Sequence, residues 1–246
     1  MNNETCTLCK NIPAIKINIL NYCKMCFEKQ LESKVLRNLN NLPYKSKILI
    51  VLHENVYDNI LLYFLNRLKN KKMHEFIIFN PQNKDFGSYN FFQVITQNSI
   101  DNLPNLDINN QTTKFNIDIL NMLQKSHLSF HKILINYKIN VVLYCKSMED
   151  ICTDLIIKVS SGVVLDKTDV CDYIFQDSCT FINMFKDIKN KEIQYMSYLQ
   201  SYKFNCTGIK NKKHKSINKF INEINKNNPL ALYNIINVVK KINKRI

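Results

Sequence analysis

Hydrophobic and polar positions along the chain follow two periods, and these predict the strands and the helices. Isoleucines at alternate positions within residues 15–19 indicate a short strand, because successive side chains of a strand point to opposite faces. Residues 47–52 (KILIVL) and 141–145 (VVLYC) are unbroken apolar runs, typical of parallel strands buried on both faces. Residues 75–79 and 91–96 are expected to form two further strands.

Other segments repeat their apolar residues every three or four positions, which predicts helices. One helix is expected to follow Phe27, and the others are expected over residues 60–68, 116–137, 148–162, 185–202 and 232–242. Strand, helix and strand follow one another over residues 47–79, the order of a βαβ unit in a parallel sheet. Residues 97–112 are predicted to be loop, and the lysine-rich residues 210–219 a linker.

The order of these elements predicts an α/β fold, a twisted parallel sheet flanked by helices in a Rossmann-like arrangement. We expect a cysteine-containing ribbon with a linking helix (residues 1–42), an α/β domain (43–209), and a basic linker whose last helix packs on that domain (210–246). Neither a transmembrane run of 18 apolar residues nor a secretory signal is visible. We therefore expect a cytoplasmic protein that does not contact membranes.

Four of the nine cysteines form two C-x2-C pairs, Cys6 with Cys9 and Cys23 with Cys26, separated by 13 residues. Two such pairs can place four thiolates at the corners of a tetrahedron around one Zn²⁺. A shell of four cysteines leaves no position for water, so the predicted zinc is structural. An iron–sulfur cluster is the alternative. The other five cysteines form no such pair and are expected to pack in the core.

Positive charge is concentrated near the C-terminus. The chain carries a net charge of +14, and residues 210–246 hold nine lysines and one arginine against one glutamate. Such a segment is typical of a solvated surface or of a protein that binds a polyanion: nucleic acid, an anionic membrane or an acidic protein. The lysines predicted to contact RNA are Lys210, Lys212, Lys213, Lys215 and Lys219.

The connection after the first predicted strand of the sheet, residues 52–59 (LHENVYDN), is where folds of this class bind nucleotides. Phosphate binding there needs glycine, so that backbone N–H groups can converge, and often serine or threonine. This connection contains none of the three, and Glu54 and Asp58 would repel a phosphate. His53 and Asn55 complete a degenerate loop, so we expect no ATP on this chain.

Several segments resemble the second subunit of the cytoplasmic tRNA 2-thiolation complex. They are residues 22–39 (YCKMCFEKQLESKVLRNL) behind the first cysteine pair, residues 141–162, 182–196 and 228–242. In residues 182–196, Asp187, Glu192 and Ile193 match the family's Arg-Pro-Leu-x-Asp-x-x-x-x-Glu-Ile pattern. Asn183 and Met184 stand where Arg and Pro are usual. The resemblance covers most of the chain in patches and implies a PP-loop ATPase-like fold.

The family pairs a catalytic PP-loop subunit with a partner whose Ser-Gly-Gly-type loop is eroded, and His53, Glu54 and Asn55 place this chain with the partner. The resemblance implies a non-catalytic subunit that binds tRNA and its paralogue and supports 2-thiolation of the wobble uridine in tRNAs for Lys, Glu and Gln. The sulfur would come from a ubiquitin-like carrier. The alternatives are a zinc-ribbon adaptor that binds no RNA, and an active ATP-dependent tRNA sulfurtransferase.

Overall fold

The structure of the 246-residue chain is a computed structural model. The structure describes residues 5–17, 19–40, 42, 44–52, 56–68, 74–80, 92–96, 133–165, 169–170, 173–175, 179–202 and 212–242. Predictions for residues 97–112, for the loop residues His53, Glu54 and Asn55, and for most of the helix expected over 116–137 lie outside these ranges.

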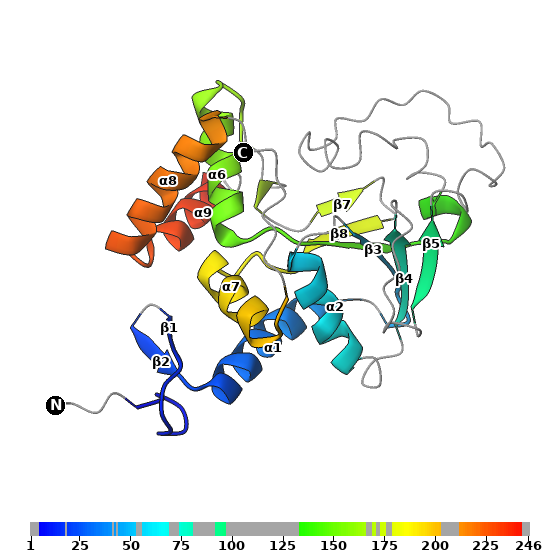
Figure 1. The fold of residues 1–246 in the computed structure, drawn as a ribbon. Coiled ribbons are helices and arrows are strands. Elements are labelled where there is room, and N and C mark those ends of the chain that lie inside the picture. The colour runs from blue at the N-terminus through cyan, green and yellow to red at the C-terminus, as the bar shows by residue number, and fades with distance from the viewer. Residues whose placement is uncertain are drawn as a thin grey trace.

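The centre of the molecule is a six-stranded sheet with the order β5-β4-β3-β6-β8-β7 (Figure 1). Five strands are parallel, as predicted, and β7 pairs antiparallel with β8 at one edge. The strands are β3 (Lys47–Val51), β4 (Glu75–Asn80), β5 (Gln93–Thr96), β6 (Val141–Tyr144), β7 (Tyr173–Phe175) and β8 (Cys179–Asn183). Strands β7 and β8 were not predicted from the sequence.

The two faces of the sheet bury different sets of side chains. In β3, Ile48 and Ile50 point into a core formed with helices α1, α2 and α7, while Leu49 and Val51 point to the opposite face. All four are at most 7% exposed, which explains the unbroken apolar run in the sequence. The opposite face is covered in part by a helical turn at residues 133–136.

The helices are α1 (Lys24–Asn40), α2 (Val56–Leu68), α6 (Met148–Ser160), α7 (Asn190–Leu199), α8 (Lys212–Asn227) and α9 (Ala231–Ile242). Figure 1 shows α1, α2 and α7 together on one side of the sheet, with α6, α8 and α9 grouped beside them. The last three share an apolar core of their own, in which Leu155, Ile221 and Leu232 are buried.

Several sequence-based boundaries are wrong. The helix predicted over 185–202 begins only at Asn190, because residues 184–187 form a turn after β8. The linker predicted over 210–219 is helical from Lys212 onward, since Ile217 and the following Ile221 pack on α6 and α9 and stabilise the helix. The connection predicted over 53–59 ends earlier, because α2 begins at Val56.

Helix α6 has strong signals at both ends. The Ser147 side chain accepts a hydrogen bond from the backbone N–H of Asp150, and the Asp150 carboxylate accepts one from the N–H of Ser147, so that the two residues form a capping box. At the other end Gly162 has a φ of 70°, a left-handed conformation that glycine adopts without strain. This agrees with the helix end predicted at Gly162.

The N-terminal segment forms a two-stranded antiparallel hairpin, β1 (Ile15–Ile17) and β2 (Leu20–Tyr22). The sequence predicted one strand over 15–19. The chain instead turns after Ile17, and Ile19 lies in the turn with 82% of its surface exposed. Tyr22 is buried against the α1 side of the core, so the hairpin packs on the body of the molecule.

Within the part of the chain that the structure describes, no helix combines the length and the apolar character needed to cross a bilayer.

Candidate functional site: a four-cysteine centre and the edge of the sheet

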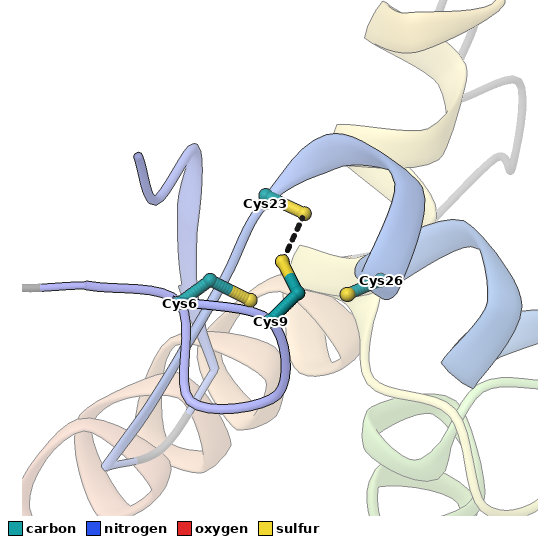
Figure 2. A group of neighbouring side chains, drawn as sticks. All are labelled: Cys6, Cys9, Cys23 and Cys26. Carbon is teal, nitrogen blue, oxygen red and sulfur yellow. Dashed lines mark hydrogen bonds between the residues drawn. The ribbon is translucent and has the colours of Figure 1, made fainter. Parts of the chain in front are cut away.

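The four cysteines of the two C-x2-C pairs converge, as the sequence predicts. The sulfur atoms of Cys6, Cys9, Cys23 and Cys26 all lie within 4.8 Å of one another. The Cys9 and Cys23 sulfurs are 3.4 Å apart, and Figure 2 shows all four side chains pointing toward a common centre. Cys6 is buried and Cys9 is exposed, so the centre lies just below the surface.

Local backbone structure sets the position of each pair. After Cys9 the chain reverses at Lys10, whose φ of 64° is left-handed and whose N–H donates to the carbonyl of Cys6. The first pair is held against the hairpin because Thr7 exchanges hydrogen bonds with Asn21. The second pair lies at the N-terminus of α1, where Cys23 precedes the helix and Cys26 lies in its first turn.

The surroundings divide the four thiols, whose thiolate form binds metals. Hydrogen bonds lower the pKa of Cys6 and Cys23. The pKa of Cys26 is instead raised to about 12, first by its hydrogen bond with Cys9, and the pKa of Cys9 is also raised. Burial raises the pKa of the Cys6 thiol, but hydrogen bonds from the backbone of Cys23, Cys9 and Leu8 outweigh burial and bring that pKa down to about 6. At the N-terminus of α1, a hydrogen bond from the backbone of Cys26 lowers the pKa of the Cys23 thiol, and the helix dipole favours negative charge at the same end.

The spacing of the sulfurs fits one metal ion. In a tetrahedral site with metal–sulfur bonds of about 2.3 Å, the sulfurs are about 3.8 Å apart, and all four sulfurs here lie within 4.8 Å of one another. A cubane iron–sulfur cluster would hold its thiolates farther apart, because its four iron atoms lie between them. The four cysteines can therefore bind a metal, and their geometry suits a single ion without rearrangement.

Helix α1 connects the cysteine centre to the sheet domain through contacts with residues 182–196. The ammonium of Lys34 on α1 lies 2.6 Å from the carboxylate of Glu192, which is almost fully buried. Arg37 forms a second, exposed pair with Asp187 at 2.9 Å. Phe27, next to Cys26, packs edge-on against Tyr195 of α7. The matched residues Asp187 and Glu192 thus fix the orientation of the cysteine-bearing helix.

The second region of interest is the carboxyl edge of the sheet between β3 and β6. From β3 the chain continues to β4 and β5 on one side of the sheet, and from β6 it continues to β8 on the other side. Strands β3 and β6 therefore flank the switch point where α/β folds bind ligands. Of the residues predicted to form the degenerate loop, the structure describes Asp58. It lies in the first turn of α2 and is only 4% exposed.

Asp58 and Cys145, the residue after β6, lie close to each other at this edge. Burial raises the pKa of the Cys145 thiol well above its ordinary value, and the charge of Asp58 raises it further. Phosphates are attracted to the positive end of a helix dipole, at the helix N-terminus. A carboxylate at that position already interacts with the positive end. This helix N-terminus therefore presents negative charge where a phosphate would need positive charge.

Beside the same edge, polar side chains of α2, α6, α7 and α8 form hydrogen bonds between these helices. The Tyr57 hydroxyl lies 2.8 Å from both Asp150 and Asn190. The carboxylate of Glu149 accepts hydrogen bonds from the backbone N–H of Asn190 at 2.8 Å and from the side chain of Asn225 at 3.2 Å. These contacts tie α2, α6, α7 and α8 together. The sequence did not predict them, because residues from four separate segments meet.

The predicted RNA-contacting lysines are placed in part. Lys215 and Lys219 are exposed on α8, and Lys212 and Lys213 belong to the same helix with side chains outside the described part. Lys210 lies outside it altogether. Lys226, which was not predicted, is exposed on the same face of α8 as Lys215 and Lys219. Lys226 follows Lys215 by 11 residues and Lys219 by 7, intervals that place all three on one face of a helix. The sequence would have identified Lys226 if this segment had been predicted to be helical.

Comparison with known proteins supports the fold. The structure is similar to that of the U34-tRNA thiolase NcsA from Methanococcus maripaludis, solved with its [4Fe-4S] cluster. The TM-score is 0.75 over 100% of this chain and 89% of that chain, at 15% sequence identity. No protein-family model matches the chain, and no curated protein matches its sequence. The chain thus has a PP-loop-type fold, a parallel sheet flanked by helices, with a four-cysteine centre at its N-terminus.

Proposed function

We propose that this protein is the non-catalytic subunit of a tRNA 2-thiolation complex, which binds tRNA and a catalytic PP-loop paralogue. The single observation that carries the proposal is the combination of a thiolase fold with an edge of the sheet that is unsuited to phosphate. The protein with the similar structure acts on uridine 34 of tRNA, so a role in the same modification is the simplest inference from the shared fold.

The chemistry of the sheet edge favours a supporting role over a catalytic one. The connection after β3 contains no glycine, serine or threonine, and Asp58 is buried at the following helix N-terminus. A nucleotide would have to displace or neutralise this carboxylate before its phosphates could approach the helix. We therefore expect no ATP on this chain, and adenylation of the uridine would fall to the paralogue.

The metal is proposed to be zinc. Four cysteine sulfurs within 4.8 Å of one another offer a closed shell, which zinc uses in structural sites. The ion would hold the hairpin against α1, whose ion pairs with Glu192 and Asp187 orient the module on the sheet domain. In this role the metal supplies folding energy and takes no part in the transfer of sulfur.

The partners follow from charge and from the resemblance. A net charge of +14 suits tRNA, and a complex with a paralogue would bring the bound tRNA to a working active site. The sulfur carrier, a ubiquitin-like protein, would act through the paralogue and contact this chain indirectly. The proposed location is the cytoplasm.

Co-expression with the PP-loop paralogue of the same cell tests the proposal. We expect one complex on size-exclusion chromatography, and 2-thiolation of tRNA by that complex but not by this chain alone. Thiolation and saturable ATP binding by the isolated chain would instead establish an active sulfurtransferase. A stable protein complex with no measurable tRNA affinity would indicate a zinc-ribbon adaptor.

A further inference from the structure

Helix α8 carries a basic face that the surrounding structure holds in a fixed orientation. Lys215, Lys219, Asn222 and Lys226 recur at intervals of four, three and four residues, which places them along one line of an α-helix. All four side chains are exposed. We call this line the α8 stripe.

Side chains beside and opposite the α8 stripe hold the helix against the body of the molecule. Ile221 is fully buried against α6 and α9. The Thr153 hydroxyl donates to the side-chain oxygen of Asn218 at 2.6 Å. The buried Lys189 donates to the side-chain oxygen of Asn225 at 2.9 Å and to the carbonyl of Pro229 at 2.7 Å. Because these contacts fix the helix about its own axis, the direction in which the α8 stripe faces is a property of the fold.

An open hollow runs along the α8 stripe. It has a volume of about 440 Å³ and is lined by Lys215, Asn218, Lys219, Asn222, Glu223 and Lys226. Three ammonium groups and the side-chain amides can donate hydrogen bonds to anionic oxygens. Glu223 is the one acidic residue of α8, so the hollow keeps a positive balance.

The dimensions of the α8 stripe suit a strand of nucleic acid. Lys215 and Lys226 are 11 residues apart, about 16 Å along the helix axis. At about 3.4 Å per nucleotide of a base-stacked strand, this length spans roughly five nucleotides. Lysine is depleted at protein–protein interfaces, whereas lysine and amide side chains provide much of the contact with phosphates. The composition therefore favours nucleic acid over an acidic protein.

We propose that the α8 stripe is a track for the phosphate backbone of RNA, with Lys215, Lys219 and Lys226 each contacting a phosphate. This inference rests on the proposed function, since it names the element that would hold the tRNA. It also places the contacts on an oriented helix, where the sequence predicted a linker over residues 210–219. Contacts to phosphates alone position an RNA without reading its sequence.

The test begins with a triple variant, Lys215→Ala, Lys219→Ala and Lys226→Ala, and with tRNA binding measured across a series of salt concentrations. Three lost phosphate contacts should lower the slope of log affinity against log salt by about 2 to 3. The affinity at low salt should fall on the order of tenfold. Far-ultraviolet circular dichroism checks that the helix content is unchanged.

A second variant moves the charge without changing its amount. Ser216, Phe220 and Asn227 are exposed and lie about 100° further around α8. Adding Ser216→Lys, Phe220→Lys and Asn227→Lys to the triple variant restores the net charge on a different face. We expect this variant to bind tRNA as weakly as the triple variant, because its lysines no longer face the hollow.

The outcomes separate this inference from the proposed function. Wild-type affinity in the charge-moved variant, or an unchanged salt slope in the triple variant, overturns the track while leaving tRNA binding intact. If the triple variant keeps its tRNA affinity but no longer binds the paralogue, the α8 stripe is a protein-docking face. If the wild-type chain has no affinity for tRNA, both the track and the RNA-binding part of the proposed function fail.

Discussion

The four-cysteine centre and the carboxyl edge of the sheet are both places where a fold of this kind can hold a ligand, and they differ in every respect that matters for binding. At the first, four donor atoms converge and backbone hydrogen bonds lower the pKa of the Cys6 and Cys23 thiols. At the second, a carboxylate is buried at the helix N-terminus and neighbouring polar groups bond to one another. One region is arranged for a ligand, and the other satisfies its polar groups internally.

The fold itself does not depend on a phosphate-binding loop, because binding sites are placed on folds rather than required by them. The sheet order places a switch point between β3 and β6, and a helix follows β3. These are the elements around which α/β folds bind ligands. What is missing is the glycine-rich backbone that would let N–H groups approach phosphates. The fold needs only apolar strands and amphipathic helices, which do not depend on those glycines.

The largest effect is expected when a metal ligand is removed. Cys23→Ser should abolish stoichiometric metal binding and unfold the β1–β2 hairpin, because binding of a structural zinc contributes on the order of 10 kcal/mol in small domains. Metal analysis gives the stoichiometry, and hydrogen exchange follows the hairpin. Cys152→Ala is the matched control, since Cys152 is buried against α9 away from the centre. Folded, metal-free wild-type protein would contradict the metal site.

The connection between the two regions gives the next effect. Glu192→Gln leaves Lys34 without its counter-charge in a nearly buried position, and should lower the free energy of unfolding by about 3 kcal/mol. Arg37→Ala breaks the exposed pair on the same helix and should cost less than about 1 kcal/mol. Urea denaturation measures both. Equal effects would show that burial does not distinguish the two pairs.

A pH dependence is expected from the polar contacts beside the sheet edge. Burial raises the pKa of Glu149 from 4.5 to about 7, with Asp150 adding to this and the backbone N–H of Asn190 and the charge of Lys189 opposing it. A folded-state pKa above the unfolded value means that the stabilisation is complete below pH 4.5 and is lost as the pH rises through 7. The loss should amount to roughly 2 to 3 kcal/mol.

Glu149→Gln should remove this part of the pH dependence, because glutamine keeps the side-chain oxygen that accepts the N–H of Asn190 but carries no ionisable group. Thermal unfolding at several pH values between 4.5 and 8 gives the measurement. If wild type and variant show parallel stability profiles over this range, Glu149 does not titrate as its surroundings indicate.

The smallest effect is expected at Asp58. Asp58→Asn removes a favourable charge from the first turn of α2 and should lower the stability by about 1 kcal/mol. ATP binding should remain absent, since the connection before α2 still lacks glycine. Calorimetric titration with Mg·ATP provides the readout. Tight ATP binding by this variant would mean that one carboxylate alone had closed the site.

Local pattern was sufficient for much of the fold and for the metal centre. The C-x2-C spacing places both sulfurs of a pair on one side of a turn, and the apolar runs of β3 and β6 identify buried strands without knowledge of their neighbours. The α1 helix was predicted because Phe27, Leu31 and Val35 share one face, and all three are buried. In each case the determining interactions are close in sequence.

The tertiary structure alone decided the features that depend on distant segments. Strand β8 was not recognised in the sequence, yet it pairs with β6 in a register that places Val141 opposite Thr180, 39 residues later. The linker became helix α8 because Ile221 found a core on α6 and α9, and Lys226 joined the α8 stripe as a result. Burial raises the pKa of Glu149, and the Asp58 carboxylate is buried at the N-terminus of α2. No local pattern predicts this burial, because it depends on which distant parts of the chain pack around each residue.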